Sequence, residues 1–160
     1  MFESVFDDQK AIKVKYMHED TRRLEINPKG DWIDCYADAT IEILPKRHAL
    51  IPLGICIQLP PGYEAHLAAR SSLFKRTGLI VANGFGIIDE SYCGDNDQWM
   101  LSVWSTGSVA SAESKYGGVI INRGDKIAQF RIIQKMPKIF IHEVPFLNHV
   151  DRGGFGSTGN

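Results

Sequence analysis

The chain has 160 residues, of which 44% are hydrophobic and 23% are charged, and its formal net charge at pH 7 is −1. These values are typical of one globular domain, and so small a charge gives no reason to expect nucleic-acid or membrane binding. No apolar run reaches the roughly 18 residues of a membrane-spanning helix. The acidic first eight residues do not resemble a secretory signal, and three widely spaced cysteines form no C-x-x-C motif. We therefore expect a cytoplasmic protein.

Short apolar or alternating segments recur along the chain, separated by glycine and proline. The segments predicted as strands are 12–16, 32–37, 40–44, two runs within 48–59, 63–69, 99–104, 119–121, 127–133 and 139–141. One short helix is predicted over Ser71–Gly78, because serine caps helix N-termini and glycine ends helices. The polar residues 105–117 predict a loop. Many short strands about ten residues apart favour an all-β sandwich or barrel.

The stretch 83–94 is the first candidate for chemistry, and it reads Asn-Gly-Phe-Gly-Ile-Ile-Asp-Glu-Ser-Tyr-Cys-Gly. Apolar residues beside a turn-forming Asp-Glu-Ser predict a β-hairpin, and the glycines let backbone approach a ligand closely. In such a hairpin the backbone can read the edge of a flat ligand, Asp89 can act on a water and Tyr92 can form a floor. By itself, however, the stretch also fits an ordinary hairpin with an exposed aspartate.

The last ten residues, 151–160, contain four glycines, one arginine, two hydroxyl side chains and one phenylalanine. This composition favours disorder, because it cannot build a core. Arginine, hydroxyl and backbone N–H groups also bind phosphates, and a phenylalanine can stack on a base. The composition therefore leaves two interpretations open, a disordered tail or a ligand-binding segment.

Five short motifs, in order over residues 32–159, resemble those of the trimeric dUTPase family. They are Trp32–Ala37, Ala69–Ser72, Gly86–Gly94, Gly124–Gln129 and Arg152–Gly159. The first match is partial, since it keeps an aspartate but lacks the usual glycine, and the fourth has Lys126 where arginine is common. Each motif is weak alone, but five in order are highly specific. The extra residues Asp95–Asp97 resemble the subgroup found in Gram-positive bacteria and their phages.

The resemblance implies a jelly-roll-like β-barrel with one short helix over residues 1–150, followed by a flexible glycine-rich C-terminal lid, 151–160. It implies Mg²⁺-dependent hydrolysis of dUTP to dUMP and pyrophosphate, which keeps uracil out of DNA and supplies dUMP for dTMP synthesis. It also implies a homotrimer in which several chains build each active site.

The resemblance assigns roles to particular residues. Asp89 is implied to orient and deprotonate the water that attacks the α-phosphorus. The triphosphate and waters, rather than protein ligands, are implied to hold Mg²⁺, with Asp34 either structural or a partner of a metal-bound water. The implied substrate-binding residues are Arg70, Ser71, Ser72 and Gln129 for phosphates, Asn83, Gly86, Ile87, Ile88 and Tyr92 for base and sugar, and Arg152, Phe155, Gly156, Ser157 and Thr158 in the lid.

Two other interpretations remain. A dCTP deaminase shares the fold, but that family needs a catalytic glutamate in a differently arranged site and lacks the glycine-rich tail motif. A regulatory module is the second, because phage relatives of dUTPases bind repressor proteins. For such a protein partner, Asp95–Asp97 and the loop 105–117 are the candidate contact surfaces, and this role can coexist with catalysis.

Overall fold

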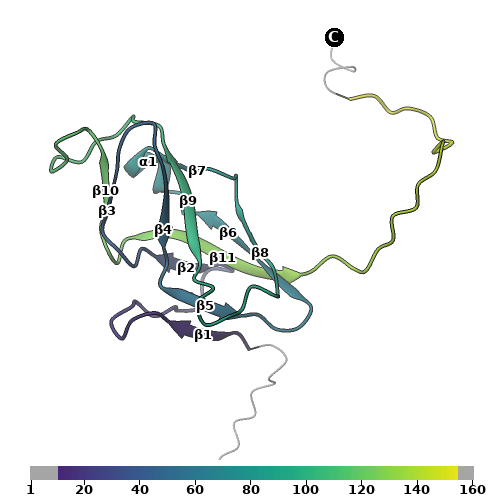
Figure 1. The fold of residues 1–160 in the computed structure, drawn as a ribbon, viewed down its shortest axis with the longest axis horizontal. Helices are drawn as coiled ribbons and strands as arrows, with labels where there is room; N and C mark the ends of the chain where they lie inside the picture. The colour runs from purple at the N-terminus through teal and green to yellow at the C-terminus, as the bar shows by residue number, and fades with distance from the viewer. Residues whose placement is uncertain (1–10, 155–160) are drawn as a thin grey trace, which may run out of the picture.

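The computed structural model describes residues 11–154, which form eleven strands and one short helix, α1 (Leu73–Thr77) (Figure 1). The strands are β1 (Lys13–Tyr16), β2 (Ile33–Tyr36), β3 (Ile41–Ile43), β4 (His48–Pro52), β5 (Ile55–Gln58), β6 (Tyr63–Ala69), β7 (Leu79–Val81), β8 (Gly86–Ile88), β9 (Met100–Ser105), β10 (Val119–Ile121) and β11 (Lys126–Gln134). In this described part of the chain no helix is long and apolar enough to cross a membrane.

The strands pair only in antiparallel fashion within the described residues, and they form four sheets. The two larger sheets have the orders β2-β11-β6-β8 and β4-β9-β7, and the two smaller ones pair β1 with β5 and β10 with β3. The predicted all-β, jelly-roll-like fold with one short helix is confirmed, although these sheets do not close into a hydrogen-bonded barrel.

The core lies between the sheets and follows from the alternation of the strands. In β9, Leu101 and Val103 are buried while Met100 and Trp104 face outward, as expected for a strand with one face on the core. Directly before β9, the buried ring of Trp99 meets Phe130 of β11 edge to face, with the ring centroids 4.9 Å apart. The core therefore fixes the two strands from which the candidate site extends.

The predicted strand at 139–141 is wrong. After Gln134 the described chain has no regular secondary structure, and residues 135–154 run away from the sheets as an extended C-terminal arm (Figure 1). Phe140 and Ile141 are 91% and 96% exposed. Apolar alternation favours a strand only where a partner covers it, and no strand of the described residues lies against this segment.

The predicted hairpin over 83–94 is also wrong. The stretch contains one strand, β8, which pairs with β6, whereas the preceding strand β7 pairs with β9 in a different sheet. After β8 the chain turns, and the N–H of Tyr92 donates to the carbonyl of Asp89 at 3.0 Å. The turn residues were recognised correctly, but the partner of the strand is β6, which lies earlier in the chain and pairs through Leu67 with Gly86.

Candidate active site

A cavity of about 280 Å³ lies beside β8, the turn before it and the start of β9. The six residues that the sequence assigned to the base, the sugar and the attacking water all line this cavity: Asn83, Gly86, Ile87, Ile88, Asp89 and Tyr92. They come from a single stretch of chain, so the structure brings together what the sequence already placed close together.

The position of β8 depends on a glycine. A Cβ atom at Gly86 would lie 3.1 Å from the Cβ atom of Leu67 on β6, which is closer than most side chains approach. The turn before β8 is supported by Phe85, whose ring centroid lies 5.1 Å from that of His66 on β6. The Nε2 atom of His66 in turn lies 2.9 Å from a carboxylate oxygen of Glu64. The cavity is thus built on strand β6.

Asp89 follows β8 directly, and its side chain is exposed and accepts no hydrogen bond from any other described residue. The hydroxyl of Tyr92 donates to the carbonyl of Gln98 at 3.2 Å, which holds the aromatic ring in the cavity wall. A carboxylate whose oxygens are unused by the protein can bind and orient a water, and this is the geometry that a general base needs.

A second group of predicted residues surrounds Asp34 on β2. Arg70, just after β6, donates to one carboxylate oxygen of Asp34, and the Nζ atom of Lys126 on β11 lies 2.9 Å from the other. The side-chain amide of Gln129 donates to the carbonyl of Ala69 at 3.1 Å. Two cations around one carboxylate leave a net positive charge, as an anion-binding site requires.

The electrostatics of Asp34 follow from these contacts. Partial burial alone would raise the pKa of this carboxyl group, but the hydrogen bonds from Lys126 and Arg70 outweigh burial, so the pKa is lowered. The carboxylate therefore acts as an anchor that orients the two cationic side chains. Of the two roles left open for Asp34, this pairing favours the structural one.

Lys126 was not among the residues predicted for the site, although its place in the fourth motif was a signal. Besides its contact with Asp34, its Nζ atom lies 5.8 Å from the ring centroid of Tyr36, its partner on β2. Lys126 and Tyr36 are far apart in the sequence, and only the pairing of β11 with β2 brings them together. The sequence alone therefore could not show this contact.

The predicted serines lie where α1 begins. The helix spans Leu73–Thr77 and ends at Gly78, whose φ is 64° and whose N–H donates to the carbonyl of Phe74, so glycine ends the helix as predicted. The predicted side-chain cap is wrong, because Ser72 occupies the N-cap position without a side-chain cap hydrogen bond. The hydroxyl of Ser72 is therefore not used by the helix.

The structure does not bring the two groups of residues into one cavity. Ile88 pairs with Ala65 on β6, whereas Arg70 follows the other end of that strand. Because a strand rises about 3.3 Å per residue, the backbone of Asp89 lies roughly 20 Å from that of Arg70. One chain therefore holds the candidate base and the candidate phosphate-binding arginine far apart.

Of the predicted lid, Arg152 is exposed at the end of the C-terminal arm, and Phe155, Gly156, Ser157 and Thr158 lie outside the described residues.

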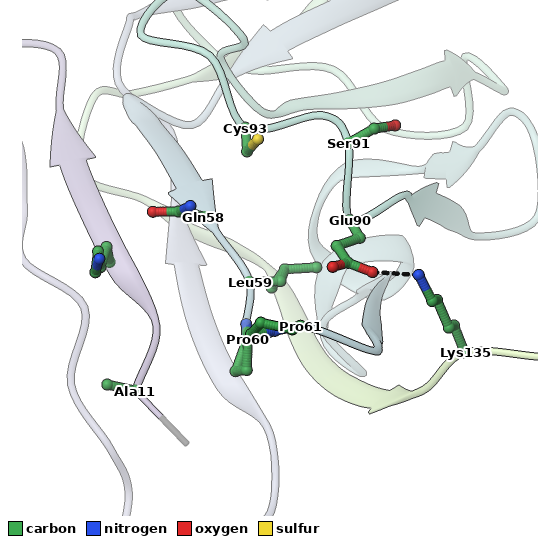
Figure 2. Close-up of a pocket in the computed structure, with 10 residues that line it drawn as sticks. Ala11, Gln58, Leu59, Pro60, Pro61, Glu90, Ser91, Cys93 and Lys135 are labelled. Carbon is green, nitrogen blue, oxygen red and sulfur yellow. Dashed lines mark hydrogen bonds and ion pairs between the residues drawn. The ribbon is translucent and has the colours of Figure 1, made fainter. Parts of the chain in front are cut away.

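A larger cavity, of about 620 Å³, is lined by none of the predicted residues but by their neighbours Glu90, Ser91 and Cys93 (Figure 2). Residues 11–154 contain no cluster of three or more His, Cys, Asp or Glu side chains that could hold a metal. Mg²⁺ keeps several of its waters and prefers phosphate oxygens, so a Mg²⁺ ion that arrives with a triphosphate needs no such cluster.

A carboxylate beside a small cavity and a separate cationic cluster, carried on a jelly-roll-like fold, fit the class of nucleotide phosphohydrolases, which need a base and a group that binds phosphates. The dUTPase family model matches residues 32–159. The chain therefore belongs to the dUTPase family, as its motifs predicted.

Several relatives are similar over most of their length. The SPbeta prophage-derived deoxyuridine 5'-triphosphate nucleotidohydrolase YosS of Bacillus subtilis (strain 168) is 45% identical over 148 residues, covering 92% of this chain and 97% of the relative. The deoxyuridine 5'-triphosphate nucleotidohydrolase of Clostridium kluyveri is 34% identical over 155 residues, covering 95% of this chain and 93% of the relative.

Solved structures show the same fold. A dUTPase of Staphylococcus bacteriophage 80alpha with dUpNHpp has a TM-score of 0.77 at 21% identity and covers 94% of this chain and 99% of its own. The dUTPase of phage phi11 of S. aureus, whose structure contains a structural Mg(II) ion, has a TM-score of 0.71 at 23% identity and covers 87% and 99%. These relatives agree with the predicted subgroup of Gram-positive bacteria and their phages.

Proposed function

We propose that the chain is a dUTP diphosphatase that hydrolyses dUTP to dUMP and pyrophosphate with Mg²⁺ as cofactor. The observation that carries the proposal is the single cavity lined by all six residues from Asn83 to Tyr92 that the family motif assigns to base, sugar and water. Relatives that bear the name of this activity support it. The reaction keeps uracil out of DNA and supplies dUMP for dTMP synthesis.

Base recognition relies on the backbone of β8. Among residues 11–154 this strand is at the edge of its sheet, with β6 on one side only, so the N–H and C=O groups along its other side have no strand partner in that part of the chain. Those groups at Gly86 and Ile87, with the amide of Asn83, read the uracil edge, while Tyr92 packs under the deoxyribose and leaves no room for a 2′-hydroxyl. A cytosine presents the wrong donors and acceptors, and each buried group left unpaired costs about 1–3 kcal/mol.

In the chemical step, the carboxylate of Asp89 takes a proton from the bound water as the water oxygen attacks the α-phosphorus. The bond from the α-phosphorus to the bridging oxygen breaks, and pyrophosphate leaves. A positioned general base contributes roughly 10²- to 10⁴-fold to the rate. Arg70, Lys126 and Gln129, with the hydroxyls of Ser71 and Ser72, orient the phosphates. Bound Mg²⁺, held by the triphosphate and waters, supplies additional neutralisation of phosphate charge.

The working unit is a homotrimer with shared active sites. The separation of about 20 Å between Asp89 and Arg70 along β6 supports this proposal, because one chain cannot offer both to one reacting phosphate. The C-terminal arm supports it too, since its large apolar side chains are exposed on the single chain. They are Met136, Ile139, Phe140, Ile141, Val144, Phe146, Leu147 and Val150. An apolar surface of this kind marks an interface between proteins.

The lid, residues 151–160, completes the site from another chain. Phe155 stacks on the base, and Arg152, Gly156, Ser157 and Thr158 surround the triphosphate. Ordering a glycine-rich segment costs conformational entropy, so only a ligand that offers both base and phosphates closes the lid.

We further infer that the protein works in the cytoplasm, because Cys35, Cys56 and Cys93 are all unpaired thiols. Binding of a protein partner is a second proposed function. The phage 80alpha dUTPases are described as controlling the transfer of virulence genes by a G protein-like mechanism. The turn Asp95–Asp97, whose Asp95 side chain is 86% exposed, and the loop 105–117 form the contact surface for such a partner.

The activity is tested by incubating the protein with Mg²⁺ and each of dUTP, dCTP, dTTP and UTP while following pyrophosphate release. The unpaired groups left by the wrong base or sugar predict a preference for dUTP of at least about tenfold. Asp89→Asn is the matched control, and it should lose nearly all turnover while binding dUMP like the unaltered protein. Equal rates with all four nucleotides would refute the proposal, and release of ammonia from dCTP would identify a deaminase instead.

A further inference from the structure

The segment Asp89–Cys93 forms a wall between two cavities. Asp89 and Tyr92 line the smaller, candidate catalytic cavity, whereas Glu90, Ser91 and Cys93 line the larger one. Figure 2 shows Glu90 paired with Lys135, the first residue after β11, on one side of the larger cavity. A change in the contacts of Glu90 is therefore expected to move the neighbouring Asp89.

Asp89 depends on its neighbours for its position. Its side chain has no hydrogen-bond partner among residues 11–154, so only the backbone of the segment determines where the carboxylate lies. Before Asp89 the backbone is fixed by β8, where Ile88 pairs with Ala65 of β6. After it, the N–H of Tyr92 donates to the carbonyl of Asp89 at 3.0 Å, and the hydroxyl of Tyr92 donates to the carbonyl of Gln98. The side chain of Glu90, the residue next to Asp89, attaches the segment to Gly62 and Lys135.

Glu90 joins three segments. Its Oε2 atom accepts a hydrogen bond from the N–H of Gly62 at 3.2 Å and pairs with the Nζ atom of Lys135. The N–H of Lys135 in turn donates to the carbonyl of Gly62 at 3.0 Å. Gly62 precedes β6, which pairs with β11 as far as Tyr63 and Gln134. Glu90 is therefore tied to the most extensively paired strands of the molecule.

The charge state of Glu90 suits this role. The hydrogen bond from Lys135, followed by that from Gly62, lowers the pKa of Glu90 below its usual value. The lowered pKa favours the carboxylate form, which is the form that accepts both hydrogen bonds.

We propose that Glu90 is a positioning residue for the reaction: through Lys135 and Gly62 it holds the segment that carries Asp89, and it couples that segment to the root of the C-terminal arm. The inference rests on the proposed role of Asp89 as the base. It predicts that loss of the ion pair impairs the chemical step rather than nucleotide binding, because Glu90 lines the other cavity.

The test is steady-state kinetics with dUTP and Mg²⁺, together with dUMP affinity and thermal melting, for four variants of the full chain. Glu90→Gln and Lys135→Met should each lower kcat about tenfold, because small displacements of a catalytic group have large effects on rate. Lys135→Arg, which keeps the charge, should stay within twofold of the unaltered enzyme. Asp20→Asn removes a different exposed ion pair, with Arg123, and should leave kcat unchanged.

In all four variants the dUMP affinity should change less than about twofold, since base-contacting groups are untouched. An unaltered kcat in both Glu90→Gln and Lys135→Met, or an equal loss in Lys135→Arg and Lys135→Met, would overturn the inference. So would a loss confined to KM. If the unaltered protein itself does not hydrolyse dUTP in this assay, the proposed function fails instead.

Discussion

Asp34 lies between Arg70 and Lys126, and these two contacts make the stability of the folded protein depend on the protonation of Asp34. The pKa of the group is lowered in the folded protein, while in the unfolded chain it returns to about 3.9. Since the folded pKa is below the unfolded one, the stabilisation is fully present above about pH 4 and is lost as the pH falls through the lowered folded value.

We therefore expect the melting temperature of the unaltered protein to fall more steeply below about pH 4 than that of Asp34→Asn, which cannot titrate at this position. Above pH 5 the difference between the two proteins should be constant. Thermal melts monitored by circular dichroism between pH 2.5 and about pH 7 measure this. Parallel curves over the whole range would show that Asp34 is not stabilised in its charged form.

Single residues were predictable where the chemistry is local. Asn83, Gly86, Asp89 and Tyr92 lie within ten positions and reach the same cavity whatever their strand pairs with. Lys126 was not assigned a role, because its contact with Asp34 arises only from the pairing of β11 with β2.

The element to which the proposed base recognition is assigned is β8, a three-residue edge strand. It approaches β6 closely because position 86 has no side chain. An edge strand of this length has few hydrogen bonds to hold it, so a small change in its spacing from β6 alters the unpaired backbone groups on its other side.

Gly86→Ala tests this dependence. The new methyl group would lie 3.1 Å from the Cβ atom of Leu67, so β8 must shift by a few tenths of an ångström. We expect a loss of about 1 kcal/mol in stability and roughly tenfold weaker dUMP binding. Isothermal titration calorimetry and thermal melting provide the measurements.

Gly30→Ala is the matched control, because a Cβ atom there meets Asn27 only at an ordinary contact distance of 3.6 Å. It should change neither quantity. Binding of dUMP by Gly86→Ala with unaltered affinity would show that the spacing between β8 and β6 does not determine recognition.

For the whole molecule, shared active sites make a quantitative prediction about mixed trimers. Asp89→Asn and Arg70→Ala should each be nearly inactive alone. After unfolding and refolding of an equal mixture, about a quarter of the sites in random trimers combine an intact Asp89 from one chain with an intact Arg70 from its neighbour.

Roughly a quarter of the unaltered activity should therefore return, and pyrophosphate release measures it. The two variants refolded separately and then combined are the control, since they cannot exchange chains. Absence of any recovery in the co-refolded mixture would contradict sites made from two chains.

Removal of residues 152–160 tests the lid. Because these residues begin within the exposed last residues of the C-terminal arm, their loss should leave the melting temperature and the oligomeric state unchanged. Turnover should fall at least about tenfold, since a lid excludes water and completes the site. Kinetics and light scattering measure both quantities, and an unchanged kcat would show that the tail plays no part in catalysis.

The amino-acid sequence by itself determined the family, the all-β class and a group of residues that line one cavity, because these depend on local motifs and on alternation along each strand. Tertiary structure decided which strands pair. It placed β8 against β6 instead of in a hairpin, left the apolar segment 139–141 without a partner strand among residues 11–154, and joined Asp34 to Lys126. The physical reason is that alternation specifies which face of a strand is buried, but not which strand covers it or lies beside it.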